Sequence, residues 1–296
     1  MTAKKPFGIV NLHKPPGMTS REAVDCVKRL VRPAKTGHAG TLDPLATGVL
    51  VVCVGPATRL IEYVQAMPKR YRAVFLLGRE SDTEDIEGQV RSIADARQPT
   101  EAEIRAAAAR LVGVIEQRPP AYSALKVQGR RAYDLARAGK AVVLAPRPVV
   151  VHRLEVVAYD YPELRLDIEC GSGTYVRSLG RDLAQSVGTA AVMSELVRTA
   201  IGCFTLADAK LPEQLLRDQP ADWLQSPLRA LSALPRIILS AGQIERLGHG
   251  QTIHGQTPSE GEMAAVDEHE ELVAIVSAQS DGTLRPVQNF AVGDRG

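Results

Sequence analysis

The run His38–Leu50 constrains this chain most, because a loop with one carboxylate, Asp43, leads directly into an apolar segment. Residues 49–54 are apolar and mostly β-branched, and Gly-Pro closes the run, which is typical of a buried strand. Gly40 and Gly48 allow backbone angles that other residues resist, and an Asp-Pro pair favours a turn. The run predicts a glycine-rich turn before a core strand, and Asp43 is either a surface residue of that turn or a functional carboxylate.

The composition is that of a soluble globular protein. The 296 residues are 45% hydrophobic and 24% charged, and the chain is long enough for one large domain and a small one. No apolar run approaches the roughly 20 residues that span a bilayer, and the N-terminus lacks the apolar stretch of a signal peptide. The four cysteines are scattered without a C-x-x-C pair, which favours reduced thiols in a cytoplasmic protein over a zinc site or a disulfide frame.

The charge is unevenly distributed, although the net charge is only +2. Residues 1–40 contain eight Lys/Arg and two acids, and residues 117–153 contain eight Lys/Arg and one acid. Residues 241–296, by contrast, contain three Arg and nine acids. Two separate basic regions fit a phosphate-rich partner, since each neutralised phosphate releases a condensed counterion. The same distribution of charge is also compatible with a surface that is only solvated and binds no such partner.

Hydrophobic periodicity and capping signals predict alternating strands and helices, with a domain boundary near residues 232–238. Residues 117–148 interrupt this alternation of strands and helices. They are basic, bounded by prolines, and contain one short amphipathic piece at 130–138. The pattern alone gives an α/β or α+β fold. Strands are expected near 7–12, 71–77, 149–159, 163–170, 199–204, 263–267 and 272–277, and helices after Thr19 and near 57–66, 100–111, 175–187 and 211–217.

The run 38–50 resembles the catalytic motif of pseudouridine synthases of the TruB type, which isomerise a uridine in the T-loop of tRNA. Most of the first 235 residues carry the resemblance, with matching pieces in the same order at 11–20, 69–78, 117–126 and 173–177. It implies a mixed α+β pseudouridine synthase fold over residues 1–235 and a small β-rich PUA-like domain over 236–296. Residues 117–148 resemble the RNA-gripping thumb of bacterial stand-alone members, which relatives that use guide RNA lack.

The resemblance makes Asp43 the essential catalytic residue and places Arg177 in an ion pair that keeps it ionised and oriented. The reaction must break the N1–C1′ bond of uridine, turn the base and join C5 to C1′. One anionic oxygen is enough for an attack on the sugar, an attack on the base or removal of a sugar proton, and the sequence leaves these routes open. By pattern alone, Arg177 is equally a solvated residue at a helix start.

Five further residues are expected to contact the substrate. By resemblance, His38 occupies the space that the flipped nucleotide vacates; the alternatives are a zinc ligand and a capped loop residue. Tyr71 would stack on the target uracil, and Tyr175 and Leu196 would line its pocket, although pattern alone equally predicts packing roles for all three. We also expect Lys14, which lies in the basic region 1–40, to contact RNA.

The leading hypothesis is a cofactor-free, metal-free enzyme that converts uridine 55 in the T-stem-loop of tRNA to pseudouridine. We expect a cytoplasmic monomer that needs no guide RNA, no obligate protein partner and no membrane. One rival is a guide-RNA enzyme, and another is a non-catalytic RNA-binding or tRNA-folding protein on the same scaffold. A glycoside hydrolase is disfavoured, because it needs two carboxylates and only one motif carboxylate is evident. The acidity of residues 241–296 leaves their share in RNA binding open.

Overall fold

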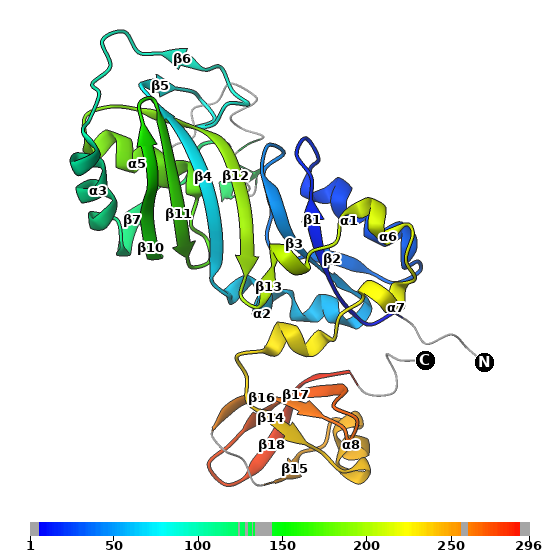
Figure 1. Ribbon diagram of the computed structural model, residues 1–296. Coiled ribbons are helices and arrows are strands. Elements are labelled where there is room, and N and C mark those ends of the chain that lie inside the picture. Colours follow the sequence, from blue (N-terminus) through cyan, green and yellow to red (C-terminus); the bar gives the residue numbers. More distant parts are fainter. Residues whose placement is uncertain are drawn as a thin grey trace.

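The computed structural model describes residues 6–123, 125–127, 130–131, 133, 144–255 and 260–290, and contains two main β-sheets (Figure 1). The larger sheet is formed from the first two thirds of the chain and the smaller one from residues 236–289. No helix in these described ranges is long and apolar enough to cross a membrane.

The larger sheet has nine strands in mixed orientation, with β4 in the middle of a seven-strand path. The path runs β1-β3-β12-β4-β11-β10-β7, with β2 beside β3 and β13 beside β12. Strands β3 and β12 pair in parallel, and the other pairs are antiparallel. The strands are β1 (Gly8–Lys14), β2 (Thr36–His38), β3 (Thr47–Val54), β4 (Lys69–Leu77), β7 (Gly113–Gln117), β10 (Arg147–Asp160), β11 (Glu163–Cys170), β12 (Ala191–Ile201) and β13 (Phe204–Thr205).

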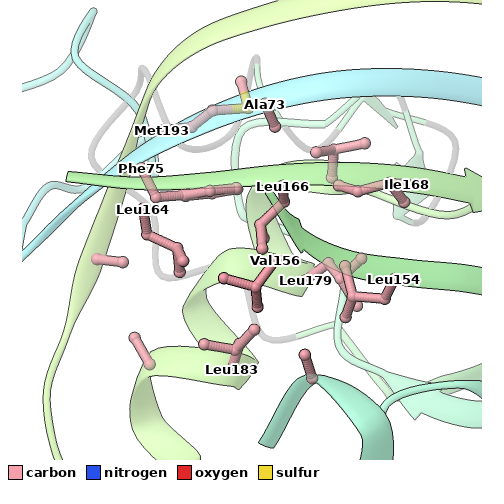
Figure 2. Packing of buried hydrophobic residues seen from close by; sticks show 14 of the residues in the cluster. Ala73, Phe75, Leu154, Val156, Leu164, Leu166, Ile168, Leu179, Leu183 and Met193 are labelled. Carbon is pink, nitrogen blue, oxygen red and sulfur yellow. The ribbon is translucent and has the colours of Figure 1, made fainter. Parts of the chain in front are cut away.

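Helices α3 (Glu101–Arg110) and α5 (Val176–Ser186) cover one face of the β4–β7 half of this sheet (Figure 1). Figure 2 shows Leu179 and Leu183 of α5 packed against strand residues such as Leu166. Gly180 lies against the ring of Phe75, so closely that a Cβ there would be 1.9 Å from a ring carbon. This packing fixes the start of α5, which carries Tyr175 and Arg177, over the centre of the sheet.

Helix α1 (Ser20–Leu30) covers the other half of the sheet, with α6 (Pro212–Leu215) and Trp223 beside it. Thr19 caps α1 through the reciprocal bonds with Glu22 that the sequence predicts, and the cap brings Ser20 to the first turn. Helical turns η1 (Gly55–Leu60) and α2 (Ile61–Ala66) lead from β3 to β4. Short elements complete this part of the chain: β5 (Arg79–Glu80), β6 (Arg91–Ser92), β8 (Lys126–Val127), β9 (Arg130–Arg131), η2 (Leu206–Asp208), α7 (Pro220–Trp223) and η3 (Pro227–Leu231).

The five-stranded sheet has the order β14-β16-β17-β18-β15, with one helix, α8, packed on it. One of its faces shares a hydrophobic core with the larger body, in which Phe290 stacks on Phe7 with 5.5 Å between ring centroids. Tyr63 of α2 donates to Glu262 at 2.9 Å across the same contact. Its elements are β14 (Arg236–Ile238), α8 (Ala241–Gly248), β15 (Ile253–His254), β16 (Gly261–Val266), β17 (Leu272–Ala278) and β18 (Thr283–Asn289).

Most of the predicted elements are confirmed, but two are not as expected. The helix predicted at 57–66 begins as a 3-10 turn, with Pro56 in its first turn, and is α-helical only from Ile61. The strand predicted at 199–204 spans the end of β12, which starts at Ala191, a tight turn and the first residue of β13. A register shift between Met193 and Glu195 breaks the alternation of buried and exposed residues, so the first half of β12 does not look like a strand in sequence. The amphipathic piece 130–138 lies largely outside the described residues.

Candidate active site

The loop that carries Asp43 lies between β2 and β3, and its backbone is held by donors from three other segments. The five consecutive carbonyl oxygens of residues 40–44 all accept hydrogen bonds. Arg198 donates to Gly40 and Thr41, at 3.0 and 3.3 Å. Ser20 Oγ donates to Leu42 O at 2.9 Å and accepts from Leu42 N at 2.8 Å. Buried polar groups that are fully paired in this way fix the conformation of a loop.

Asp43 and Arg177 form the ion pair that the resemblance implies, with 3.0 Å between Nε and Oδ2. The Arg177 side chain is 7% exposed, whereas that of Asp43 is 34% exposed. Burial raises the pKa of Asp43, the charge of Arg177 opposes that rise, and the charge of Asp85 adds to it. One edge of the carboxylate is thus fixed by a buried guanidinium, while part of the group remains open to solvent.

Arg177 is itself held by the loop at residues 81–87. Its Nη1 donates to Thr83 O at 2.7 Å and lies 3.4 Å from Asp85 Oδ2, and its Nη2 donates to Tyr122 O at 3.1 Å. One residue further along this loop, Glu84 has a positive φ of 63° and pairs with Arg181 of α5. A non-glycine residue in this region costs energy, so the contacts of its side chain must hold it there.

Asp85 is a residue of the candidate site that the sequence pattern does not single out, since it lies in an acidic stretch between residues 78 and 88. Its side chain is 3% exposed and lies beside Arg177, so a second carboxylate accompanies the motif carboxylate Asp43. Its Oδ1 accepts from Thr83 Oγ1 at 2.5 Å and from Glu87 N at 3.1 Å. Since its oxygens are occupied in this way, Asp85 serves Arg177 and is not a free second acid or base. Nothing in the sequence pattern distinguished Asp85 from its acidic neighbours.

Tyr71 and Leu196 come from the adjacent strands β4 and β12. Tyr71 is half-buried against the main core, and Leu196 is buried in it opposite Ala73. Burial raises the pKa of Tyr71; the charge of Arg198 opposes the rise, and the charge of Asp43 adds to it. Tyr71 therefore lies within the electrostatic reach of Asp43.

Tyr175 lies just before α5, two residues from Arg177. The buried Gln117 holds its backbone on both sides, accepting from Tyr175 N at 2.8 Å and donating to Tyr175 O at 3.1 Å. Arg147 lies over its ring, with 5.5 Å between Cζ and the ring centroid. This ring is therefore placed at the root of segment 117–148.

His38 ends β2, immediately before the loop that carries Asp43, and is half-buried. Burial lowers its pKa and the charge of Arg198 lowers it further, which favours the neutral imidazole. Within the described ranges, no group of three or more His, Cys, Asp or Glu residues is arranged to hold a metal ion.

The structure contradicts the expected RNA contact of Lys14. Its side chain is fully buried, and Nζ donates to Pro15 O, Met18 O and Pro44 O at 2.9, 2.6 and 3.2 Å. Burial lowers the pKa of Lys14 to about 8, although the charges of Glu87 and Asp43 oppose this. With its three donors used, Lys14 ties the end of β1 to the Asp-Pro turn instead of reaching a phosphate.

Several known proteins are similar to this chain in sequence. A model of the TruB family pseudouridylate synthases, N-terminal domain, matches residues 28–176. A "tRNA pseudouridine synthase B" from Dehalococcoides mccartyi is 39% identical over 290 residues, 96% of each chain. A protein of the same name from Symbiobacterium thermophilum is 44% identical over 82% of each chain.

Solved structures share the fold at lower identity. A Cbf5-Nop10-Gar1 complex contains a chain that is 24% identical, with a TM-score of 0.75 over 99% of this chain and 87% of that one. An H/ACA RNP bound to a substrate RNA gives a TM-score of 0.74, with 97% and 86% covered. The chain thus shares its fold with proteins of these complexes. From the family match and the relatives together, the chain belongs to the TruB family of pseudouridylate synthases.

Proposed function

We propose that this chain converts uridine 55 in the T-loop of tRNA to pseudouridine, without guide RNA and with Asp43 as the essential carboxylate. The relatives at 39–44% identity are named tRNA pseudouridine synthase B, which supports tRNA as the substrate class. The structures from H/ACA complexes are only 24% identical and support the fold alone. The observation that carries the proposal is the Asp43–Arg177 ion pair, in which Asp43 lies on a loop whose backbone carbonyl oxygens all accept hydrogen bonds.

The geometry suits a carboxylate that acts on a substrate atom. Arg177 engages Oδ2 of Asp43 at 3.0 Å, which leaves Oδ1 as the oxygen for the substrate. The other nitrogens of the buried guanidinium bond to Thr83 O and Tyr122 O, which fixes the direction from which Nε reaches Asp43 better than a flexible ammonium could. In the proposed reaction Oδ1 acts on the sugar or the base of the target uridine, and the three routes that the sequence leaves open remain alternatives.

The remaining site residues would hold the flipped nucleotide. An enzyme that acts on a glycosidic bond must take the nucleotide out of the stack, at a cost of a few kcal/mol. Stacking on the Tyr71 ring would recover about 1–3 kcal/mol of that cost. Leu196 and Tyr175 would form the apolar walls of the pocket, and neutral His38 would contact the space that the base leaves. Lys14 is not among the residues that would hold the nucleotide, because its donors are used within the protein.

Residues 117–148 would act as the thumb that grips RNA, and their root supports this. Arg177 and Arg181 of α5 donate to the carbonyl oxygens of Tyr122 and Arg118, so the root is bonded to the helix that holds Asp43. Most of the segment between residues 124 and 143 lies outside the described residues. For residues 236–296 we propose a PUA-like domain that is docked on the catalytic body through Phe290 and Glu262.

The decisive experiment compares the wild type with Asp43→Asn on an unmodified tRNA transcript labelled with tritium at C5 of uridine. We expect the wild type to release tritium from position 55 and the Asn variant to release none, with tRNA affinity changed by no more than about threefold. Asp160→Asn, an exposed carboxylate at the far end of β10, is the matched control and should behave as wild type.

Two outcomes would contradict the proposal. Tritium release by the Asn variant at a rate near wild type would mean that Asp43 is not the essential group. Release from a transcript with cytidine at position 55, at the wild-type rate, would mean that the target is another uridine.

A further inference from the structure

Arg198 on β12 is a buried cation that the proposed reaction does not yet use. It is 2% exposed and is the bulkiest of the fully buried side chains. Its guanidinium donates to three carbonyl oxygens, those of Val49 at 2.7 Å, Gly40 at 3.0 Å and Thr41 at 3.3 Å. Among the described residues, the carboxylates nearest the site pair with Arg177 and Arg181, and none pairs with Arg198. Since buried charges are usually paired, a cation solvated by carbonyls is unusual.

The sheet places Arg198 between the Asp43 loop and Tyr71. In the sheet register, Arg198 lies opposite Gly48 of β3 on one side and opposite Tyr71 of β4 on the other. Gly48 has a φ of +102°, and a Cβ there would lie 2.2 Å from Arg198 O. The glycine at position 48 of the motif run is therefore required for the close approach of Arg198.

Arg198 and Tyr71 lie directly opposite each other on neighbouring strands, so their side chains are on the same face of the sheet. A positive charge so close to a phenol favours its ionised form. The charge of Arg198 therefore lowers the pKa of Tyr71 against the rise that burial causes.

We propose, on the basis of the function proposed above, that Arg198 is a positioning residue of the uridine pocket. It holds the backbone of the Asp43 loop and lies directly opposite Tyr71 in the sheet, so that the carboxylate and the ring keep one geometry. In this proposal Arg198 itself contacts neither the target uridine nor the carboxylate of Asp43. Its two bonds to Gly40 and Thr41 act directly before Asp43, and its bond to Val49 anchors the strand that follows.

The first measurement is the titration of Tyr71, which does not depend on activity. The seven tyrosines are replaced by 3-fluorotyrosine, and the ¹⁹F resonance that disappears in Tyr71→Phe is assigned to Tyr71. In Arg198→Met we expect this resonance to titrate at a higher pH than in the wild type. Arg72→Met is the control: it removes a guanidinium next to Tyr71, but one that is exposed and lies 3.9 Å from Asp167. It should leave the titration unchanged, because neighbouring residues on a strand point to opposite faces.

The second measurement is pseudouridine formation in a single turnover at saturating enzyme. We expect Arg198→Met to be slower by about tenfold to a hundredfold, with tRNA affinity within about threefold of wild type. Arg198→Lys keeps the charge but not the planar fork. It should restore most of the Tyr71 titration and only part of the rate.

A folded Arg198→Met variant with the titration and rate of the wild type would overturn the proposal. If that variant does not fold, Arg198→Lys decides: a wild-type rate overturns the proposal and a reduced rate supports it. Failure of the proposed function is distinguishable, because a wild type that makes no pseudouridine still reports the link between Arg198 and Tyr71 through the ¹⁹F titration.

Discussion

Two loops meet at the Asp43–Arg177 ion pair, and they are built in opposite ways. The loop at residues 40–44 offers backbone carbonyls, and side chains from three distant segments donate to them. The loop at residues 81–87 instead offers its own carboxylates and one carbonyl, which hold the arginines of α5. Both loops thus supply acceptors, but the first uses its backbone and the second uses mainly its side chains.

This difference shows how the positions of the two partners in the ion pair are set. Asp43 is positioned through its backbone, so the surroundings of its loop set where the carboxylate lies. Arg177 is positioned through its guanidinium. Its contacts with Asp85 and Thr83 set its orientation, and the negative charge of Asp85 partly offsets its positive charge. Changes in the second loop should therefore alter catalysis, as should loss of Arg198, which also lies opposite Tyr71. Loss of a side chain that only holds the backbone of the first loop, such as Ser20, should alter stability more than rate.

Arg177→Lys tests the pair itself and should have the largest effect. Lysine keeps the charge, but it cannot hold Asp43, Asp85 and two carbonyls at once. We expect the single-turnover rate to fall about a hundredfold, as for a misplacement of about 1 Å, with tRNA binding little changed. Arg181→Lys, one turn later on α5, is the control and should lose much less. Equal losses in the two variants would mean that α5 as a whole, and not the pair, limits the rate.

Asp85→Asn tests the second loop with a smaller change. The amide keeps the shape but removes a charge that raises the pKa of Asp43, so that pKa should fall. We expect a rate about tenfold lower and an acid limb of the pH–rate profile displaced to lower pH. Single-turnover rates over a pH series measure both. An acid limb that stays in place would contradict the coupling between the two carboxylates.

Ser20→Ala tests the first loop. The change leaves the buried N–H and C=O of Leu42 without partners, which should cost about 1–3 kcal/mol in the free energy of unfolding. The rate should fall less than about threefold, because Lys14 and Arg198 still hold the loop. Urea unfolding measures the first effect. Ser186→Ala, where the hydroxyl only bonds within α5, should change stability by about 0.5 kcal/mol or less. A large loss of rate with unchanged stability would reverse our ranking of the two loops.

Lys14→Met should have little effect on the rate at neutral pH, and its signature is the pH dependence of stability. The pKa of Lys14 is about 8 in the folded protein and 10.5 as its ordinary value, so the unfolded chain binds more protons between these limits. Stability from this group therefore rises with pH across that window, by up to about 1.4 kcal/mol per pH unit.

Urea unfolding of both proteins at several pH values tests this. The difference between wild type and Lys14→Met should grow in favour of the wild type above pH 8. Lys69, whose pKa burial also lowers to about 8, is present in both proteins and cancels in the difference. A difference that does not vary with pH would show that Lys14 is not buried as a charged group.

Much of the fold could be predicted from the sequence, because local patterns report local structure. The capping boxes of Thr19 and Thr100 give the starts of α1 and α3, and alternation gives β4 and β11. Where the alternation is interrupted the prediction fails, as at the register shift in β12. The family motif also fixed Asp43 and its partner Arg177, since the resemblance includes both residues.

The sequence by itself determined the strand, the glycine-rich loop and the carboxylate that the loop presents. Only the tertiary structure decided which charges surround that carboxylate. Asp85 and Arg198 are 42 and 155 positions away from Asp43. The ammonium of buried Lys14 is received by carbonyls of Pro15 and Met18 in its own turn and by that of Pro44 in the Asp43 loop. Whether a charged side chain is solvated, paired or buried depends on groups brought together by sheet pairing and helix packing. No pattern of neighbours along the chain contains that information.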